Sequence, residues 1–208
     1  MRRILLAAVV TALLPFAASA QSRTSYASTS NSSSMSAGLL IGMEDFSGDT
    51  GLALRADGVF GVKYLAPRVL FSGIVSLGYT NWGTSSGSID PFTGNGITAS
   101  SSLNMLKIIP AARFTFDIAP QFDLYADAGL GFYYAHAALK TTTTTPGFPN
   151  TVVEASASDT GVLMRFAGGA TFALTPSFRL GAEAGFNPYF GDIDQTSFTL
   201  MALAQFRM

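Results

Sequence analysis

The sequence predicts an all-β protein: an eight-stranded antiparallel transmembrane β-barrel of up-and-down topology that follows a cleaved signal peptide. Three observations support this prediction. The composition is apolar without long apolar runs after residue 20, short proline turns divide the chain at nearly equal intervals, and the segments between the turns alternate between apolar and polar residues.

The composition is unusual for a soluble domain. Hydrophobic residues make up 48% of the chain and charged residues only 12%, whereas soluble domains carry about 25% charged residues. After residue 20 no apolar run reaches the ~20 residues that a transmembrane helix needs. Hydrophobicity that is spread over alternating strands is typical of a membrane barrel.

The first twenty residues have the order of a secretory signal peptide. Arg2 and Arg3 precede an apolar stretch, and Ala18-Ser19-Ala20 forms a small-residue cleavage site. We expect residues 1–20 to be removed between Ala20 and Gln21. A membrane anchor is the alternative, but the apolar run is short for one. Residues 21–35 are rich in Ser and Thr and are expected to form a flexible lead-in to a barrel of residues 36–208.

Three similar segments predict short hairpin turns. Each has an aliphatic residue, a small residue, proline, a polar residue and an apolar residue, at 65–69, 118–122 and 174–178. Proline sets the backbone angle of a tight turn and cannot donate to a strand ladder. Each of the two intervals then holds two strands and one longer connection, and one pair of strands beyond each outer turn brings the total to eight. The longer connections are expected at 44–50, 83–101, 141–159 and 187–195.

The strands alternate with a period of two. In the strand after Pro120, Phe122, Leu124 and Ala126 share one face while Asp123 and Asp127 share the other. The apolar face would meet lipid and the polar face the lumen, and closure of the barrel leaves no unpaired edge in hydrocarbon. Aromatic residues near predicted strand ends are expected to form interfacial girdles; they are Tyr64, Phe71, Tyr79, Trp82, Phe116, Phe122, Phe178 and Tyr189.

Charged residues of the strands fall on the lumen-facing register. Unpaired buried charges are costly, and the interior of an eight-stranded barrel is just wide enough for its own side chains. We therefore expect a plugged lumen with paired charges and no open channel. The network is expected to comprise Arg55, Asp57, Lys107, Arg113, Asp117, Asp127, Arg165, Arg179, Glu183 and Arg207, with Lys63 and Asp123 on the same register.

The remaining acids lie in or beside the expected longer loops: Glu44, Asp45, Asp49, Asp90, Glu154, Asp159, Asp192 and Asp194. They are either simply solvated or gather divalent cations, although no EF-hand spacing occurs. The chain has no cysteine, phosphate-binding loop or zinc-type cluster, so we expect no cofactor and no metal site. No basic excess indicates nucleic acid as a partner.

By these features the chain resembles the small outer-membrane β-barrel superfamily, which includes the OmpA transmembrane domain and the OmpX and opacity-protein groups. The resemblance covers residues 36–208 and includes a last strand that alternates up to Phe206 and Met208, where the family usually ends in Phe. It implies export through the Sec pathway to the outer membrane of a Gram-negative bacterium, with a periplasmic lead-in. Implied partners are outer-membrane lipid and lipopolysaccharide, the barrel-assembly machinery that reads Phe206 and Met208, and a surface ligand of the outer loops.

Three hypotheses for function follow. The favoured one is a non-enzymatic barrel for envelope stability or adhesion, with residues 141–159 as the largest contact surface. The first alternative is transport of small hydrophobic molecules, which needs an apolar pocket to which Leu106, Ile108 or Leu203 would contribute. The second is a lipid A-modifying enzyme, which would bring His136 together with Ser156 or Ser158 and Asp159.

Overall fold

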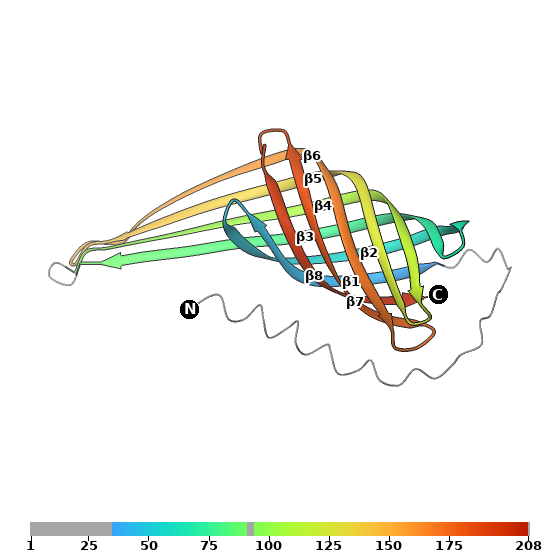
Figure 1. Ribbon diagram of the computed structural model, residues 1–208. Helices are drawn as coiled ribbons and strands as arrows, with labels where there is room; N and C mark the ends of the chain where they lie inside the picture. Colours follow the sequence, from blue (N-terminus) through green and yellow to red (C-terminus); the bar gives the residue numbers. More distant parts are fainter. Residues whose placement is uncertain (1–34, 91–93, 208) are drawn as a thin grey trace. The chain divides into compact units, whose positions relative to one another are not determined.

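A computed structural model describes residues 35–90 and 94–207 of the chain (Figure 1). The expected signal peptide, its cleavage site at Ala20 and Gln21, the lead-in up to residue 34 and Met208 lie outside the described residues, so these predictions are untested. Among the described residues there is no helix long and apolar enough to cross a membrane.

Eight strands form one closed antiparallel barrel in sequence order, which confirms the predicted fold class. Strand β1 closes the ring by pairing with β8, from Ser36 opposite Arg207 to Phe46 opposite Ser197. The strands are β1 (Ser36–Phe46), β2 (Asp49–Ala66), β3 (Val69–Ile89), β4 (Gly96–Ala119), β5 (Phe122–Thr144), β6 (Thr151–Ala173), β7 (Phe178–Phe190) and β8 (Thr196–Arg207).

The three proline turns lie where the sequence predicts them. They join β2 to β3 at residues 67–68, β4 to β5 at 120–121 and β6 to β7 at 174–177. These turns, together with Ser36 and Arg207, define one end of the barrel, which we call the turn end. The other four connections lie at the opposite end, which we call the loop end.

The β1–β2 connection is shorter than predicted. Strands β1 and β2 pair up to Phe46 opposite Asp49, which leaves a turn of only Ser47 and Gly48. Both residues have positive φ angles, 57° and 92°, as the type I′ hairpin turn requires. The predicted loop at 44–50 is therefore mostly strand.

Strands β3 to β6 continue beyond the closed ring. Pairing of β2 with β3 ends at Leu52 opposite Asn81, whereas β3 and β4 remain paired out to Ile89 opposite Gly96. We call residues 83–89, 96–102, 138–144 and 151–156, which are paired in register with one another, the sheet extension (Figure 1). The predicted loops at 83–101 and 141–159 are thus largely β-structure. Their Ser and Thr residues resemble a loop in composition, but antiparallel neighbours satisfy their backbone groups.

Burial alternates along the barrel wall as the sequence predicts. In β1, Leu40 is buried, while its neighbours Leu39 and Ile41 are exposed on the outer surface. Such an apolar outer surface fits hydrocarbon. The girdle prediction is wrong for two residues. Trp82 and Tyr189 are only 5% and 1% exposed and lie inside the barrel, because they fall on the inward register of their strands.

Candidate functional site

The middle of the lumen is filled by a group of charged side chains that we call the central network. Its members come from five different strands, and all are buried. The network consists of Arg55, Arg113, Arg165, Asp57, Asp127 and Glu183. Since three arginines face three acids, the formal charges of the central network cancel.

Arg55 links the two sides of the barrel. Its Nε and Nη2 atoms donate to the two Asp57 oxygens at 2.8 and 3.0 Å, and its Nη1 and Nη2 atoms donate to the Glu183 oxygens, each at 2.7 Å. Bidentate bonds of this kind fix geometry as well as adding energy. Strands β2 and β7 are not neighbours in the ring, so the Arg55–Glu183 pair bridges the lumen.

Asp127 joins the other two arginines to the network. It accepts two hydrogen bonds from Arg113, both 2.7 Å long, and one of 3.2 Å from Arg165 Nη2. Arg165 Nη2 also donates to Glu183 at 2.8 Å, and the Arg113 guanidinium lies 4.0 Å from the Tyr125 ring centroid. Among the described residues no buried side-chain nitrogen or oxygen lacks a hydrogen-bond partner, so the network meets the condition under which buried charges are tolerated.

A second buried pair, Lys107 with Glu44, lies nearer the loop end. Glu44 contacts the Lys107 ammonium and accepts hydrogen bonds from Thr80 Oγ1 at 2.6 Å and from the Tyr189 hydroxyl at 2.7 Å. The sequence prediction placed Glu44 in or beside an outer loop and apart from the lumen charges, and its burial inside the barrel corrects this. Strand β1 continues to Phe46, so Glu44 keeps the inward register of the strand.

Five of the expected lumen charges lie outside the central network, at the turn end. Arg179 forms an ion pair with Asp123, and Asp117 is half-buried. Lys63 is exposed, and the β2–β3 register shifts between Phe60 and Lys63, which corrects its assignment to the lumen. Arg207 is also exposed, but Asp117 and Arg179 are its electrostatic neighbours, so its place among the lumen charges stays a prediction.

Apolar side chains surround the Lys107–Glu44 pair at the loop end. They form a buried cluster of Trp82, Met105, Ile109, Tyr133, Ala135, Leu163 and Tyr189. The prediction for Leu106 and Ile108 is wrong, because both face outward at 44% and 51% exposure, on either side of the inward Lys107. Leu203 does face inward, but it belongs to a different cluster with Leu40, Ala53, Tyr125 and Met201.

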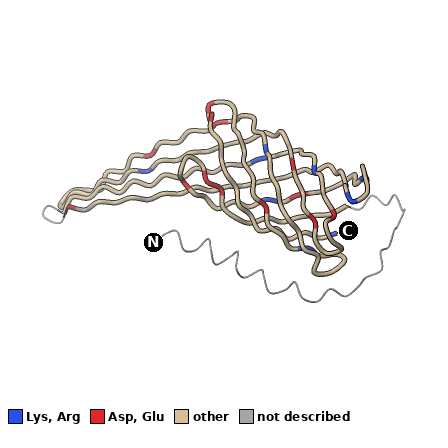
Figure 2. Tube along the Cα trace, viewed as in Figure 1, with Lys and Arg blue, Asp and Glu red and all other residues tan. Residues whose placement is uncertain are grey.

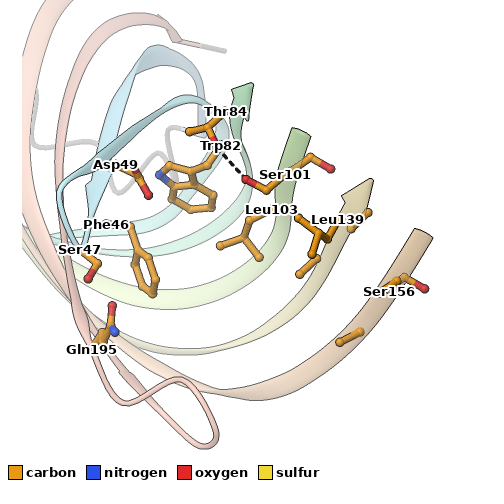
Figure 3. Close-up of a pocket in the computed structure, with 15 residues that line it drawn as sticks. Phe46, Ser47, Asp49, Trp82, Thr84, Ser101, Leu103, Leu139, Ser156 and Gln195 are labelled. Carbon is orange, nitrogen blue, oxygen red and sulfur yellow. Dashed lines mark hydrogen bonds between the residues drawn. The ribbon is translucent and has the colours of Figure 1, made fainter. Parts of the chain in front are cut away.

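A pocket opens where the sheet extension leaves the barrel (Figure 3). Its volume is about 490 Å³. Phe46 and Trp82 have ring centroids 5.7 Å apart and line it together with Leu103 and Leu139 of the neighbouring strands. The other lining residues are small or polar: Ser47, Asp49, Thr84, Ser101, Ser102, Ala137, Ala138, Ala155, Ser156, Ala157 and Gln195. This pocket was not predicted from the sequence, since several of its lining residues, such as Thr84, Ser101 and Ser156, were expected in loops.

The residues of the enzyme hypothesis come together only in part. His136 Nδ1 lies 3.0 Å from Ser158 Oγ, and the two residues are paired directly across β5 and β6. Asp159, the next residue in the strand, points to the opposite face, where it accepts a 2.8 Å hydrogen bond from Tyr133. Ser156 is exposed two positions away. No group of three or more His, Asp or Glu that could hold a metal ion occurs within residues 35–90 and 94–207.

The described part of the last strand keeps its outward alternation. Phe206 is exposed on the outer surface, and its ring lies 4.8 Å from that of Phe178 between centroids. With Met208 undescribed, the structure leaves the expected assembly signal as a prediction.

Comparisons with known proteins agree with this architecture. The model of the outer membrane protein beta-barrel domain family matches residues 5–206. No curated protein sequence is significantly similar to the chain.

Solved structures show the same fold. A major outer membrane protein from Thermus thermophilus is 13% identical, with a TM-score of 0.53, and the match covers 85% of this chain and 100% of that one. Neisserial surface protein A is 15% identical, with a TM-score of 0.50, over 84% of this chain and 96% of that one. Since the family model spans nearly the whole chain, the protein belongs to the outer membrane protein β-barrel domain family and is a bacterial outer-membrane barrel.

Proposed function

We propose that this protein is a non-enzymatic structural or surface-interaction barrel, closed to solutes, which uses the sheet extension as its contact surface in adhesion or envelope stability. The observation that carries the closed lumen is the central network, in which Arg55 and Glu183 join opposite sides of the barrel. Outer-membrane lipid and lipopolysaccharide would surround the apolar wall, and the assembly machinery would read the strand that ends at Phe206 and Met208.

Opening a channel through this lumen would require the network to separate. Breaking a buried ion pair by removing one partner costs about 3–5 kcal/mol, and several such pairs share the same acids here. Glu183 alone accepts from Arg55, Arg165 and the Tyr125 hydroxyl. A closed barrel with displayed strands is therefore favoured over a general channel.

The sheet extension supports a role in contact because it is an ordered surface rather than a set of loops. Each of its strands has six or seven residues, which at about 3.4 Å per residue corresponds to about 20–24 Å. The outer parts of β3 and β6 are edges of this sheet, since each pairs there with one neighbour only. Edge strands offer backbone groups to a partner chain.

Two measurements test the proposal. The refolded mature chain, checked by the shift of its gel mobility on boiling, should pass neither ions nor small hydrophobic compounds when it is placed in liposomes. Clear ion flux would contradict the closed lumen.

The contact role is tested with a shortened variant. Residues 83–102 and 138–156 would each be replaced by Ser-Gly, the pair that forms the native β1–β2 turn. Cells of a non-adherent Gram-negative strain that express the full chain should adhere or aggregate, and cells with the shortened barrel at equal surface level should not. If cells with the full chain and cells with the shortened barrel adhered equally, or if both survived detergent better than cells without the protein, the role would belong to the barrel itself.

Transport of small hydrophobic molecules is the second candidate. The apolar cluster around Trp82, Met105 and Leu163 favours it, since a hydrophobic solute would meet apolar side chains on the loop-end side of the central network. Uptake of a hydrophobic dye without ion flux, lost when Met105→Glu is introduced, would make transport the leading function. Catalysis is disfavoured because Asp159 faces away from the His136–Ser158 contact.

A further inference from the structure

The pocket at the base of the sheet extension has walls of two kinds. One part is aromatic and aliphatic, with Phe46, Trp82, Leu103 and Leu139, and the rest of the lining is small or polar and includes several hydroxyl-bearing residues. Thr84 and Ser101 are hydrogen-bonded to each other at 2.6 Å (Figure 3). A volume of about 490 Å³ is within the ~300–1,000 Å³ range of small-molecule sites and too small for a protein domain.

The aromatic wall is preformed. The Trp82 indole Nε1 donates a 3.0 Å hydrogen bond to the backbone oxygen of Glu44, and the ring packs against Phe46, whose other ring neighbour is Tyr189. A ring held by its own hydrogen bond needs no reordering when a ligand binds, which lowers the entropy cost of binding.

The charge around the pocket is of one sign. Asp49 is the single charged residue among the lining residues, and none of them is Lys or Arg. Asp45, next to the last residue of β1, and Asp192 and Asp194, in the β7–β8 connection, also lie at the loop end, where Figure 2 shows acidic positions. The described cations nearby are already neutralised: Lys107 by Glu44, and Lys140 by Glu154 at 2.8 Å.

We propose that this pocket binds a small organic cation with an apolar body. The apolar body lies against Leu103 and Leu139, and the positive charge lies between the Trp82 ring and Asp49. Aromatic faces attract cations through their negative π-surface, and the Asp49 carboxylate adds attraction of the same sign. An anion would be repelled both by the aromatic faces and by the carboxylate. The inference goes beyond the proposed function and needs only the folded barrel, so neither depends on the other.

The protein carries its own reporter for this binding. Trp82 is the single tryptophan of the chain, so its fluorescence, excited at a wavelength where simple benzyl compounds do not absorb, reads the pocket without a label. The full mature chain is placed in nanodiscs of zwitterionic lipid and titrated with benzyltrimethylammonium, its uncharged isostere neopentylbenzene, and phenylacetate. We expect a saturable change in Trp82 fluorescence with benzyltrimethylammonium. Neopentylbenzene should bind at least tenfold more weakly, and phenylacetate should not bind.

Two variants locate the site. Asp49→Asn should weaken binding of benzyltrimethylammonium several-fold and leave that of neopentylbenzene unchanged. The matched control, Asp192→Asn, removes a loop-end carboxylate that does not line the pocket and should change binding less than twofold. Leu139→Lys, at an exposed position of the sheet extension, should abolish binding of the ammonium compound by placing an ammonium inside the pocket.

The possible results are decisive. If the isostere binds as tightly as the cation, and Asp49→Asn changes nothing, the charge preference is overturned. If none of the three compounds changes Trp82 fluorescence saturably, the site itself is overturned. If Asp192→Asn and Asp49→Asn weakened binding of benzyltrimethylammonium equally, general attraction by an acidic surface would explain the binding. That result would also overturn the assignment to the pocket.

Discussion

Arg55 and Glu183 are 128 residues apart in the sequence and form two hydrogen bonds of 2.7 Å across the lumen. Arg55 also holds Asp57, its neighbour on the same face of β2, and Glu183 also holds Arg165 of β6. Through these two residues the central network ties strands together that share no backbone hydrogen bonds. Barrel closure and lumen filling are therefore mutually dependent.

Removing one charge of this network should destabilise the barrel strongly. Glu183→Gln leaves Arg55 and Arg165 short of a buried anion, and we expect a loss of about 3–5 kcal/mol in the free energy of unfolding. Urea unfolding in liposomes, followed by gel mobility, measures it. The control is Glu154→Gln, which removes an exposed ion pair with Lys140 and should leave the unfolding midpoint unchanged. Equal midpoints for both variants would contradict a stabilising role of the network.

A charge on the barrel wall should be costly, and a charge on the sheet extension should not. Leu77 faces outward in the part of β3 that pairs with β2, whereas Val153 is exposed on the extension. Leu77→Arg should destabilise the protein by up to ~2–4 kcal/mol, the range for arginine near the bilayer midplane. Val153→Arg should fold as the parent does. Unfolding curves in liposomes compare the two variants. Similar losses in the free energy of unfolding would place the sheet extension in the membrane.

Substitution of an inward-facing glycine by alanine should be costly where the glycine faces the central network. A Cβ at Gly169 would lie 2.4 Å from the Tyr125 ring, whereas one at Gly58 would meet only a backbone oxygen at 3.9 Å. Tyr125 is held between Arg113 and Glu183, so it has little freedom to move. Gly169→Ala should cost about 1–3 kcal/mol through overpacking, and Gly58→Ala should cost less. Thermal unfolding of the refolded variants measures the difference.

The sheet extension contains a pH-dependent contact outside the membrane. The hydrogen bond from Lys140 and the attraction of its positive charge lower the pKa of Glu154 below the ordinary value of 4.5. A lowered pKa in the folded state means that the ion pair contributes above the unfolded pKa and is lost as pH falls through the folded one. NMR titration of the Glu154 carboxyl should give a pKa below 4.5, which returns toward 4.5 in Lys140→Met. An unchanged pKa in that variant would show that the pair does not form in solution.

How much of the molecule was predictable depends on the kind of signal. The turns around Pro67, Pro120 and Pro176 were correctly predicted, because proline restricts its own backbone whatever lies around it. The connection at Ser47-Gly48 was predicted in the right place but too long, although a Ser-Gly pair before alternating residues is a usable hairpin signal. Trp82 was assigned to the outer surface, since an aromatic residue near a strand end suits either face.

The sequence by itself determined the eight strands, their proline turns and the alternation of faces along each strand, because period-two alternation and proline geometry are local properties. Only the tertiary structure decided where the strands end and which charges meet. Ser- and Thr-rich segments become strands when neighbours pair with them, as at 83–89 and 151–156. Whether Glu44 lies in solvent or meets Lys107 depends on β1 and β4 facing each other across the closed ring, which no local pattern specifies.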